Sequence, residues 1–146
     1  MQFTMALQNI PEFIFNHWFL FLVLVATLAL LAHNLIQGNK GTVDPLGATD
    51  LMNRREAVVI DGRPLADFAQ GHILNAVNLP MNGFKNQITS LHKHKGKPII
   101  VNCRSGSQSA MACNLLRKEG FEEVYNLRGG ILAWQSANLP VTRKRR

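Results

Sequence analysis

Apolar and polar residues divide this chain of 146 residues into two unlike parts. Residues 13–39 contain no Asp, Glu, Lys or Arg, and the stretch from Trp18 to Ala32 is apolar except for one threonine. From residue 40 onward, short apolar runs alternate with polar segments that contain glycine or proline. The first pattern predicts a membrane-spanning helix, and the second predicts a water-soluble domain with both helices and strands.

The apolar part is long enough to span a bilayer. A helix over residues 13–36 would be about 36 Å long at about 1.5 Å per residue, against a hydrocarbon core of about 30 Å. A cleaved signal peptide would need basic residues near its start, and none precedes Lys40. A buried core helix would carry a polar face, which this run lacks. We therefore expect an uncleaved transmembrane helix.

Charge predicts how this helix is oriented. All 16 Lys and Arg residues lie at or after Lys40, and the only charged residue before it is Glu12. Because positive flanking residues stay on the cytoplasmic side, we expect the N-terminus outside and the following domain in the cytoplasm. The basic surplus and the basic tail fit either a solvated terminus or attraction to anionic lipid. No nucleic-acid partner is expected, since no aromatic platform or nucleic-acid motif accompanies the basic residues.

Composition adds two exclusions. With 47% hydrophobic and 17% charged residues, the chain is not of the disordered class. Its two cysteines are too few for a disulfide scaffold and suit a reducing compartment.

The alternation of elements after residue 40 predicts an α/β fold with a central, mostly parallel sheet flanked by helices. The expected strands are residues 57–61, 76–79, 98–103 and 123–127. The expected helices are residues 45–55, 65–70, 84–92, 108–119 and 129–134. The whole chain then comprises a short N-terminal segment (1–12), the transmembrane helix (13–36), a linker (37–41), the α/β domain (42–141) and a basic tail (142–146).

The candidate chemistry lies at the carboxyl ends of two strands, where open parallel sheets bind ligands. Cys103 stands where the strongest predicted strand gives way to a small polar loop and then a helix. Backbone N–H groups of such a loop and the helix dipole both favour a thiolate, the nucleophilic form. On local sequence alone, a buried structural cysteine fits as well as a catalytic one. Asp61 and Arg63, after another strand, either border the pocket or form an internal ion pair.

The order and spacing of several motifs resemble the single-domain rhodanese family, and with the expected anchor the chain resembles its bacterial membrane-anchored members. The matching segments are Asp61-Gly-Arg63, Asp67-Phe68, Gly71-His-Ile73, Asn75-Ala-Val-Asn-Leu-Pro80, Cys103-Arg-Ser-Gly106 and Gly129-Gly-Ile-Leu-Ala-Trp134. This resemblance implies a rhodanese-like domain and a single-pass protein of the bacterial inner membrane.

The resemblance also implies sulfurtransferase activity. Cys103 would take sulfane sulfur from a small donor such as thiosulfate or a persulfide, and a thiol or protein acceptor would remove it. The residues implied to bind the donor are Arg104, Ser105, Gly106, Ser107, Gln108 and Ser109. This chemistry needs no metal and no organic cofactor, so none is expected.

Three features qualify this expectation. Active relatives often carry Arg where this chain has Gln108, which predicts weak activity with thiosulfate. A phosphatase loop would need Arg six positions after the cysteine, and Ser109 stands there. Cys113 lies on the predicted helix, where a core role is expected. The alternative function is a membrane-tethered rhodanese-fold module that binds a partner protein and has little or no catalytic activity.

Overall fold

The structure of the chain, a computed structural model, describes residues 16–38 and 41–144, without the side chains of residues 34–38. The chain divides into two compact units, Met1–Lys40 and Gly41–Arg146. In the first unit, helix α3 spans Trp18–Gly38, and its described side chains are exposed.

Nothing in residues 16–38 and 41–144 forms a helix that is both long enough and apolar enough to cross a membrane. The structure therefore does not support the transmembrane helix expected over residues 13–36. Residues 13–15 of that expected helix lie outside the described residues.

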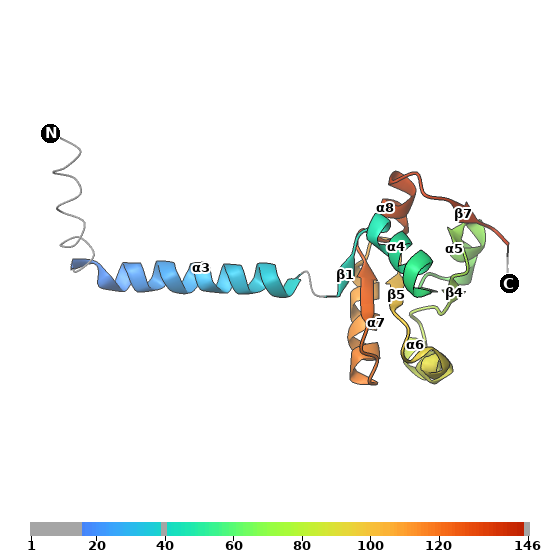
Figure 1. Cartoon of the computed structure of the whole chain (residues 1–146), viewed down its shortest axis with the longest axis horizontal. Coiled ribbons are helices and arrows are strands. Elements are labelled where there is room, and N and C mark those ends of the chain that lie inside the picture. The colour runs from blue at the N-terminus through green and yellow to red at the C-terminus, as the bar shows by residue number, and fades with distance from the viewer. Residues whose placement is uncertain (1–15, 39–40, 145–146) are drawn as a thin grey trace. The chain divides into compact units, whose positions relative to one another are not determined.

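The second unit is built on a five-stranded sheet in the order β1–β6–β5–β2–β4, and every neighbouring pair of strands is parallel. These strands are β1 (Thr42–Val43), β2 (Val58–Asp61), β4 (Val77–Asn78), β5 (Ile99–Asn102) and β6 (Val124–Leu127). A separate antiparallel pair joins β3 (His72–Ile73) to β7 (Val141–Thr142). The predicted α/β fold with a mostly parallel sheet is confirmed (Figure 1).

Helices pack against both faces of this sheet (Figure 1). On one face they are α4 (Pro45–Arg55) and α8 (Gly130–Ser136), and on the other α6 (Phe84–Gln87), the 3₁₀ helix η1 (Ile88–His94) and α7 (Ser107–Lys118). A further short helix, α5 (Leu65–Gln70), follows β2. Successive side chains of the central strand β5 alternate between the faces. Ile99 and Val101 join the cluster that contains α6 and α7, whereas Ile100 joins the cluster that contains α4 and α8. A strand covered on both faces is largely apolar, and β5 is apolar except for Asn102 at its end.

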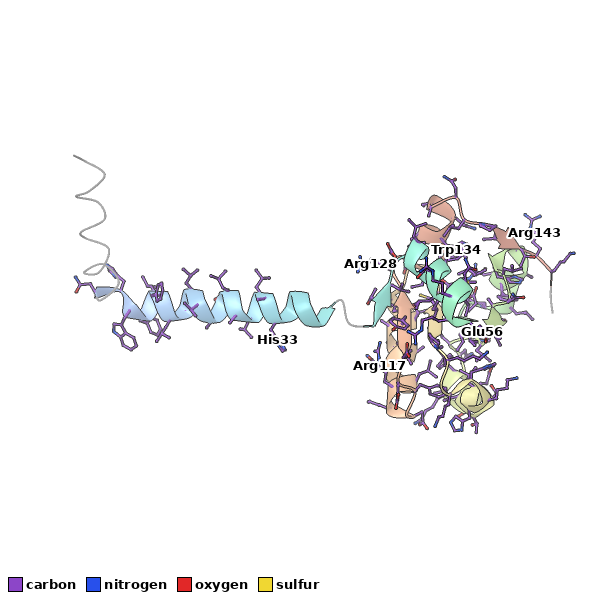
Figure 2. The ribbon with its side chains drawn as sticks, viewed as in Figure 1. His33, Glu56, Arg117, Arg128, Trp134 and Arg143 are labelled. Carbon is purple, nitrogen blue, oxygen red and sulfur yellow. The ribbon has the colours of Figure 1, made fainter. Side chains whose placement is uncertain are left out.

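Local signals account for the best-predicted helices. Asp44 caps α4, since its side chain accepts a hydrogen bond from the Gly47 N–H at 2.8 Å, and proline occupies the first helical position. α5 ends before Gly71, as expected. Trp134 of α8 is buried, and its indole N–H donates to the Pro140 carbonyl oxygen at 3.0 Å (Figure 2).

Two details differ from the sequence-based expectation. The single helix expected over residues 84–92 is instead α6 followed by η1, which continues to His94. Buried Ile88 and Leu91 are three positions apart, which suits the three-residue turn of a 3₁₀ helix. The two-residue strands β1, β3 and β7 were not predicted, because they are too short to show a period. Thr142, assigned to the basic tail, pairs with His72 in this ladder.

Candidate active site

The Cys103 sulfur lies at the carboxyl end of the parallel sheet, directly after β5. Cys103 is 1% exposed. Its Sγ accepts hydrogen bonds from the Gly106 N–H at 3.1 Å, the Ser109 N–H at 3.4 Å and the Ser109 hydroxyl at 3.2 Å. These donors come from the loop after β5 and from the first turn of α7. We call the group formed by Ser105, Gly106 and Ser109 the sulfur cradle.

The sulfur cradle changes the acidity of the thiol. Burial raises the pKa of Cys103, but hydrogen bonds from Ser109, Gly106 and Ser105 lower it further than burial raises it. The net pKa is below the ordinary value of a cysteine, because these hydrogen bonds favour the charged sulfur. Cys113 on α7 is different, since burial raises its pKa to about 12. Of the two free cysteines, only Cys103 is therefore poised as a nucleophile.

The N-terminal end of α8 sets the orientation of the loop backbone. The Ile131 N–H donates to the carbonyl oxygen of Cys103 at 2.9 Å, and the Leu132 N–H donates to that of Arg104 at 3.4 Å. This approach requires glycine at position 130, where φ is +58° and a Cβ atom would clash with the backbone of Cys103 and Arg104. With its carbonyl groups held by α8, the loop can turn later N–H groups toward the sulfur.

Asp61 and Arg63 form a buried ion pair beside this loop. The Arg63 Nη2 atom lies 2.7 Å from Asp61 Oδ2 and also donates to the Gly71 carbonyl oxygen at 2.8 Å. Asp61 accepts further hydrogen bonds from the Arg63 N–H and from the Asn102 side chain. Separating the two side chains would leave a buried charge uncompensated, which is energetically unfavourable. The ion pair therefore holds the Arg63 guanidinium in a single place.

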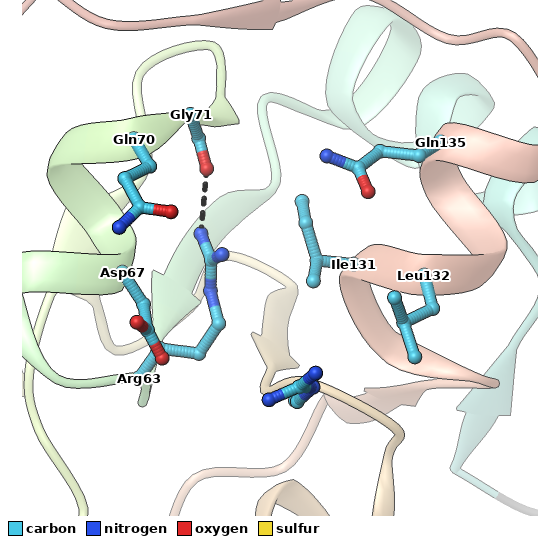
Figure 3. A pocket seen from close by; sticks show the side chains of 8 residues that line it. Arg63, Asp67, Gln70, Gly71, Ile131, Leu132 and Gln135 are labelled. Atoms are coloured by element: carbon cyan, nitrogen blue, oxygen red, sulfur yellow. Dashed lines mark hydrogen bonds between the residues drawn. The ribbon is translucent and has the colours of Figure 1, made fainter.

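Arg63 and Arg104 line the same cavity, which we call the two-arginine pocket (Figure 3). Its volume is about 260 Å³. The complete lining is Arg63, Asp67, Gln70, Gly71, Arg104, Ile131, Leu132 and Gln135. Ile131 and Leu132 also bind the carbonyl groups of Cys103 and Arg104, so this cationic pocket adjoins the cysteine loop.

The structure separates the residues that sequence analysis grouped into one binding loop. Ser105, Gly106 and Ser109 act on the sulfur, whereas Arg104 lines the two-arginine pocket. Gln108 lines another cavity, of about 330 Å³, together with apolar side chains such as Phe84 and Met111. We call this cavity the apolar pocket. Ser107 begins α7, and its Oγ lies 3.3 Å from that of Ser105.

Of the two residues expected to border a pocket, Arg63 lines the two-arginine pocket. Asp61 is not part of that lining and instead accepts a hydrogen bond from the Arg63 guanidinium. Within residues 16–38 and 41–144, no group of three or more His, Cys, Asp or Glu side chains is arranged to hold a metal ion.

Sequence reasoning missed Asn126 on β6. Its side chain accepts a hydrogen bond from the Ser109 hydroxyl at 2.6 Å and donates one to the Gly106 carbonyl oxygen at 2.9 Å. The available signal was an amide residue inside a short strand that is otherwise largely apolar.

Fold and site together define a class: an α/β domain whose cysteine follows a parallel strand and is held by the loop and helix beyond it. The family model described as the rhodanese-like domain matches residues 45–137. The chain belongs to the rhodanese-like domain family.

Individual proteins agree with this assignment. The chain is 36% identical over 141 residues to YibN from Escherichia coli (strain K12), an alignment that covers 94% of this chain and 99% of that protein. It is 36% identical over 91 residues to a protein of Allochromatium vinosum named Sulfurtransferase, covering 62% of this chain and 83% of the relative. The crystal structure of a rhodanese-related protein from Thermoplasma volcanium shares the fold, with a TM-score of 0.64 and 24% identity, covering 70% and 98% of the two chains.

The contact between α8 and the cysteine loop predicts the effect of two alanine substitutions. Gly130→Ala should lower the free energy of unfolding by about 2 kcal/mol or more beyond Gly96→Ala, because both positions have positive φ but only Gly130 meets backbone atoms. Urea denaturation of the two variants measures the difference. Equal losses of stability would show that α8 can move away from the loop at little cost.

Proposed function

We propose that the protein is a sulfurtransferase that carries sulfane sulfur as a persulfide on Cys103 and passes it to a thiol or another thiophilic acceptor. The observation that carries this proposal is the buried Cys103 sulfur, to which three groups donate hydrogen bonds. Such a site stabilises an anionic sulfur without a metal or an organic cofactor. Membership of the rhodanese-like family and a relative named Sulfurtransferase support the same reaction class.

The proposed reaction has two displacement steps. The Cys103 thiolate attacks the outer sulfur of a donor such as thiosulfate. The sulfur–sulfur bond of the donor breaks, and its electron pair leaves with sulfite. The acceptor thiolate then attacks the outer sulfur of the persulfide, and the electron pair of that bond returns to Cys103. Thiolate is regenerated, so the cycle needs no added oxidant or reductant.

The sulfur cradle can serve both steps. Gly106 and Ser109 stabilise the Cys103 thiolate before the first step and again when it leaves in the second. The two-arginine pocket supplies Arg63 and Arg104 next to the loop, and we propose that it receives the anionic donor or acceptor. Arg63 is the preorganised member, since Asp61 and the Gly71 carbonyl group hold it.

The two cysteines provide a matched test of the nucleophile. We expect Cys103→Ser to reduce sulfur transfer from thiosulfate to cyanide to background, because the hydroxyl oxygen cannot form a persulfide. Cys113→Ser should retain most of the activity, since Cys113 is buried with a pKa of about 12. Steady-state thiocyanate formation measures both.

Equal losses in the two variants would show that the roles assigned to the cysteines are wrong. Full activity in Cys103→Ser would exclude the persulfide mechanism. Absence of sulfur transfer in the native protein would instead favour the alternative function, a membrane-tethered module that binds a partner protein and has little or no catalytic activity.

We also propose that thiosulfate is a poor donor for the native protein, because Gln108 places no positive charge in the first turn of α7, the turn that contains Ser109. Gln108 lies one residue before Ser109 and lines the apolar pocket. A hydrogen bond to a charged group contributes about 1.5–3 kcal/mol, or roughly 10- to 150-fold in affinity.

Gln108→Arg should therefore lower the apparent KM for thiosulfate by about tenfold or more. The matched control is Met111→Arg, which adds the same charge farther along α7, at a side chain that is 71% exposed and lines the same pocket. High salt should weaken the gain if Coulomb attraction causes it. No gain from Gln108→Arg, or an equal gain from Met111→Arg, would contradict this explanation of donor preference.

A third proposal concerns location and rests on the sequence alone. We infer that residues 13–36 tether the protein to the inner membrane of a bacterium, with the N-terminus outside and the rhodanese-like domain in the cytoplasm. Its support is the uncharged apolar run followed by all 16 basic residues.

Fractionation and a reporter fusion test this location. The full chain should remain with membranes after alkaline extraction, whereas a variant lacking residues 1–40 should appear in the soluble fraction. A reporter fused after Arg146 should be active only in the cytoplasm. Release of the full chain by alkaline extraction, or cleavage of the domain by protease added from outside, would contradict the proposal.

A further inference from the structure

We propose that Asn126 is the positioning residue of the sulfur cradle: it ties two of the residues that donate N–H groups to the Cys103 sulfur, Gly106 and Ser109, to strand β6. This inference rests on the proposed role of Cys103 as the nucleophile. Asn126 does not touch the sulfur. One side-chain amide bridges the two sides of the cradle, accepting from the Ser109 hydroxyl at 2.6 Å and donating to the Gly106 carbonyl oxygen at 2.9 Å.

Hydrogen-bond chemistry fixes the orientation of this amide. The Gly106 carbonyl oxygen can only accept, so the Asn126 Nδ2 group must face it. Asn126 Oδ1 must then face the Ser109 hydroxyl, which donates to it. With the amide reversed, two acceptors would meet at Gly106. The bridge therefore has one satisfactory arrangement, which holds the cradle in one geometry.

The proton of the Ser109 hydroxyl gives the bridge a second consequence. Oγ lies within hydrogen-bond distance of both Asn126 Oδ1 and Cys103 Sγ, but it carries a single proton. In the thiol state, the S–H group can donate to Oγ while the hydroxyl donates to Asn126. In the thiolate state, the Ser109 hydroxyl can donate its one proton either to Asn126 Oδ1 or to Cys103 Sγ, but not to both. The N–H groups of Gly106 and Ser109 have no such competing acceptor, because each donates directly to the sulfur.

Asn126 therefore has two opposing influences on the thiolate. By holding the N–H donors in place it stabilises the charge, and by accepting the hydroxyl proton it withholds one donor. We infer that positioning dominates, because the bridge orders two backbone donors and competes for only one hydroxyl. Removing the Asn126 side chain should consequently make the thiolate harder to form.

The strand itself does not depend on this side chain. The backbone of Asn126 is paired with Val101 of β5, and its N–H donates to the Gly41 carbonyl oxygen at 2.7 Å. Truncation to alanine therefore leaves the backbone ladder of β6 intact while it removes both arms of the bridge.

Three ionisable residues around the cysteine loop bear on this test. Cys113 lies on α7, and its raised pKa keeps it neutral near pH 7. Arg104 is the next residue in the loop, and its side chain lines the two-arginine pocket. Asp61, at the end of the adjacent strand β2, is paired with Arg63. Alanine at position 126 alters none of these groups directly.

The test is the pH dependence of Cys103 alkylation by iodoacetamide in the full chain, with Cys113→Ser as the common background. The native sequence in this background should show a midpoint below the ordinary pKa of a cysteine, which is about 8.5. Asn126→Ala should raise the midpoint by about one pH unit. Because the thiolate is the form that reacts, the alkylation rate near pH 7 should then be about tenfold lower. The matched control is Asn114→Ala on the exposed surface of α7, whose side chain accepts a hydrogen bond from Arg117 and whose removal should leave the midpoint unchanged.

A double-mutant cycle with Ser109→Ala tests whether Asn126 acts on the Cys103 sulfur through Ser109. Each single substitution should raise the midpoint, and the double variant should shift less than the sum, because the hydroxyl arm is missing in both. An unchanged midpoint in Asn126→Ala would overturn the proposal. A lowered midpoint would also overturn it, by showing that withholding the hydroxyl proton dominates. Strict additivity would overturn the claim that Asn126 acts through Ser109.

If Asn126→Ala does not fold, the isosteric Asn126→Asp carries the test. It places a carboxylate oxygen against the Gly106 carbonyl group and should also raise the midpoint, so an unchanged or lowered value would overturn the proposal. Alkylation requires no sulfur transfer, which separates the two claims. A shifted midpoint in a protein that transfers no sulfur would contradict the proposed function and leave the role of Asn126 intact. Normal sulfur transfer together with an unshifted midpoint would overturn the proposed role of Asn126 and leave the proposed function intact.

Discussion

The rest of this site depends on one requirement: a charged sulfur must be stabilised in a position that is almost completely buried. A thiolate that is 1% exposed would be unfavourable without compensation, because burial disfavours the charged form. Compensation comes from N–H groups of Gly106 and Ser109 and from the Ser109 hydroxyl, all of which are parts of the fold itself. The geometry of the loop after β5 therefore decides whether Cys103 is a reactive group or an inert core residue.

Three neighbouring elements hold that loop. Strand β5, apolar over Ile99–Val101 and covered on both faces, places Cys103 at the carboxyl edge of the sheet. Helix α8 binds the carbonyl oxygens of Cys103 and Arg104, an approach that glycine at position 130 permits. Asn126 on β6 holds the other end of the loop. The site thus relies on regular elements rather than on a long mobile segment, which suits a group that must be preorganised.

The sequence predicted what local patterns encode. The apolar strand ending at Cys103, the small polar loop and the following helix could all be read from neighbouring residues, and so could α4 with its Asp44 cap. Contacts between distant segments could not. Nothing local shows that Asn126 bridges Gly106 and Ser109, or that Gln108 lines the apolar pocket while Arg104 lines another. The change from α6 to η1 was also missed, because three-residue and 3.6-residue periods are indistinguishable over so few turns.

The central claim is that Cys103 carries sulfane sulfur, and the mass of the protein after reaction tests it most directly. The full chain is incubated with excess thiosulfate, freed of the donor and analysed intact and after digestion under non-reducing conditions. We predict a mass increase of one sulfur atom on the peptide that contains Cys103, reversed by cyanide or by a thiol. An unmodified Cys103, or added sulfur on Cys113 instead, would contradict the account.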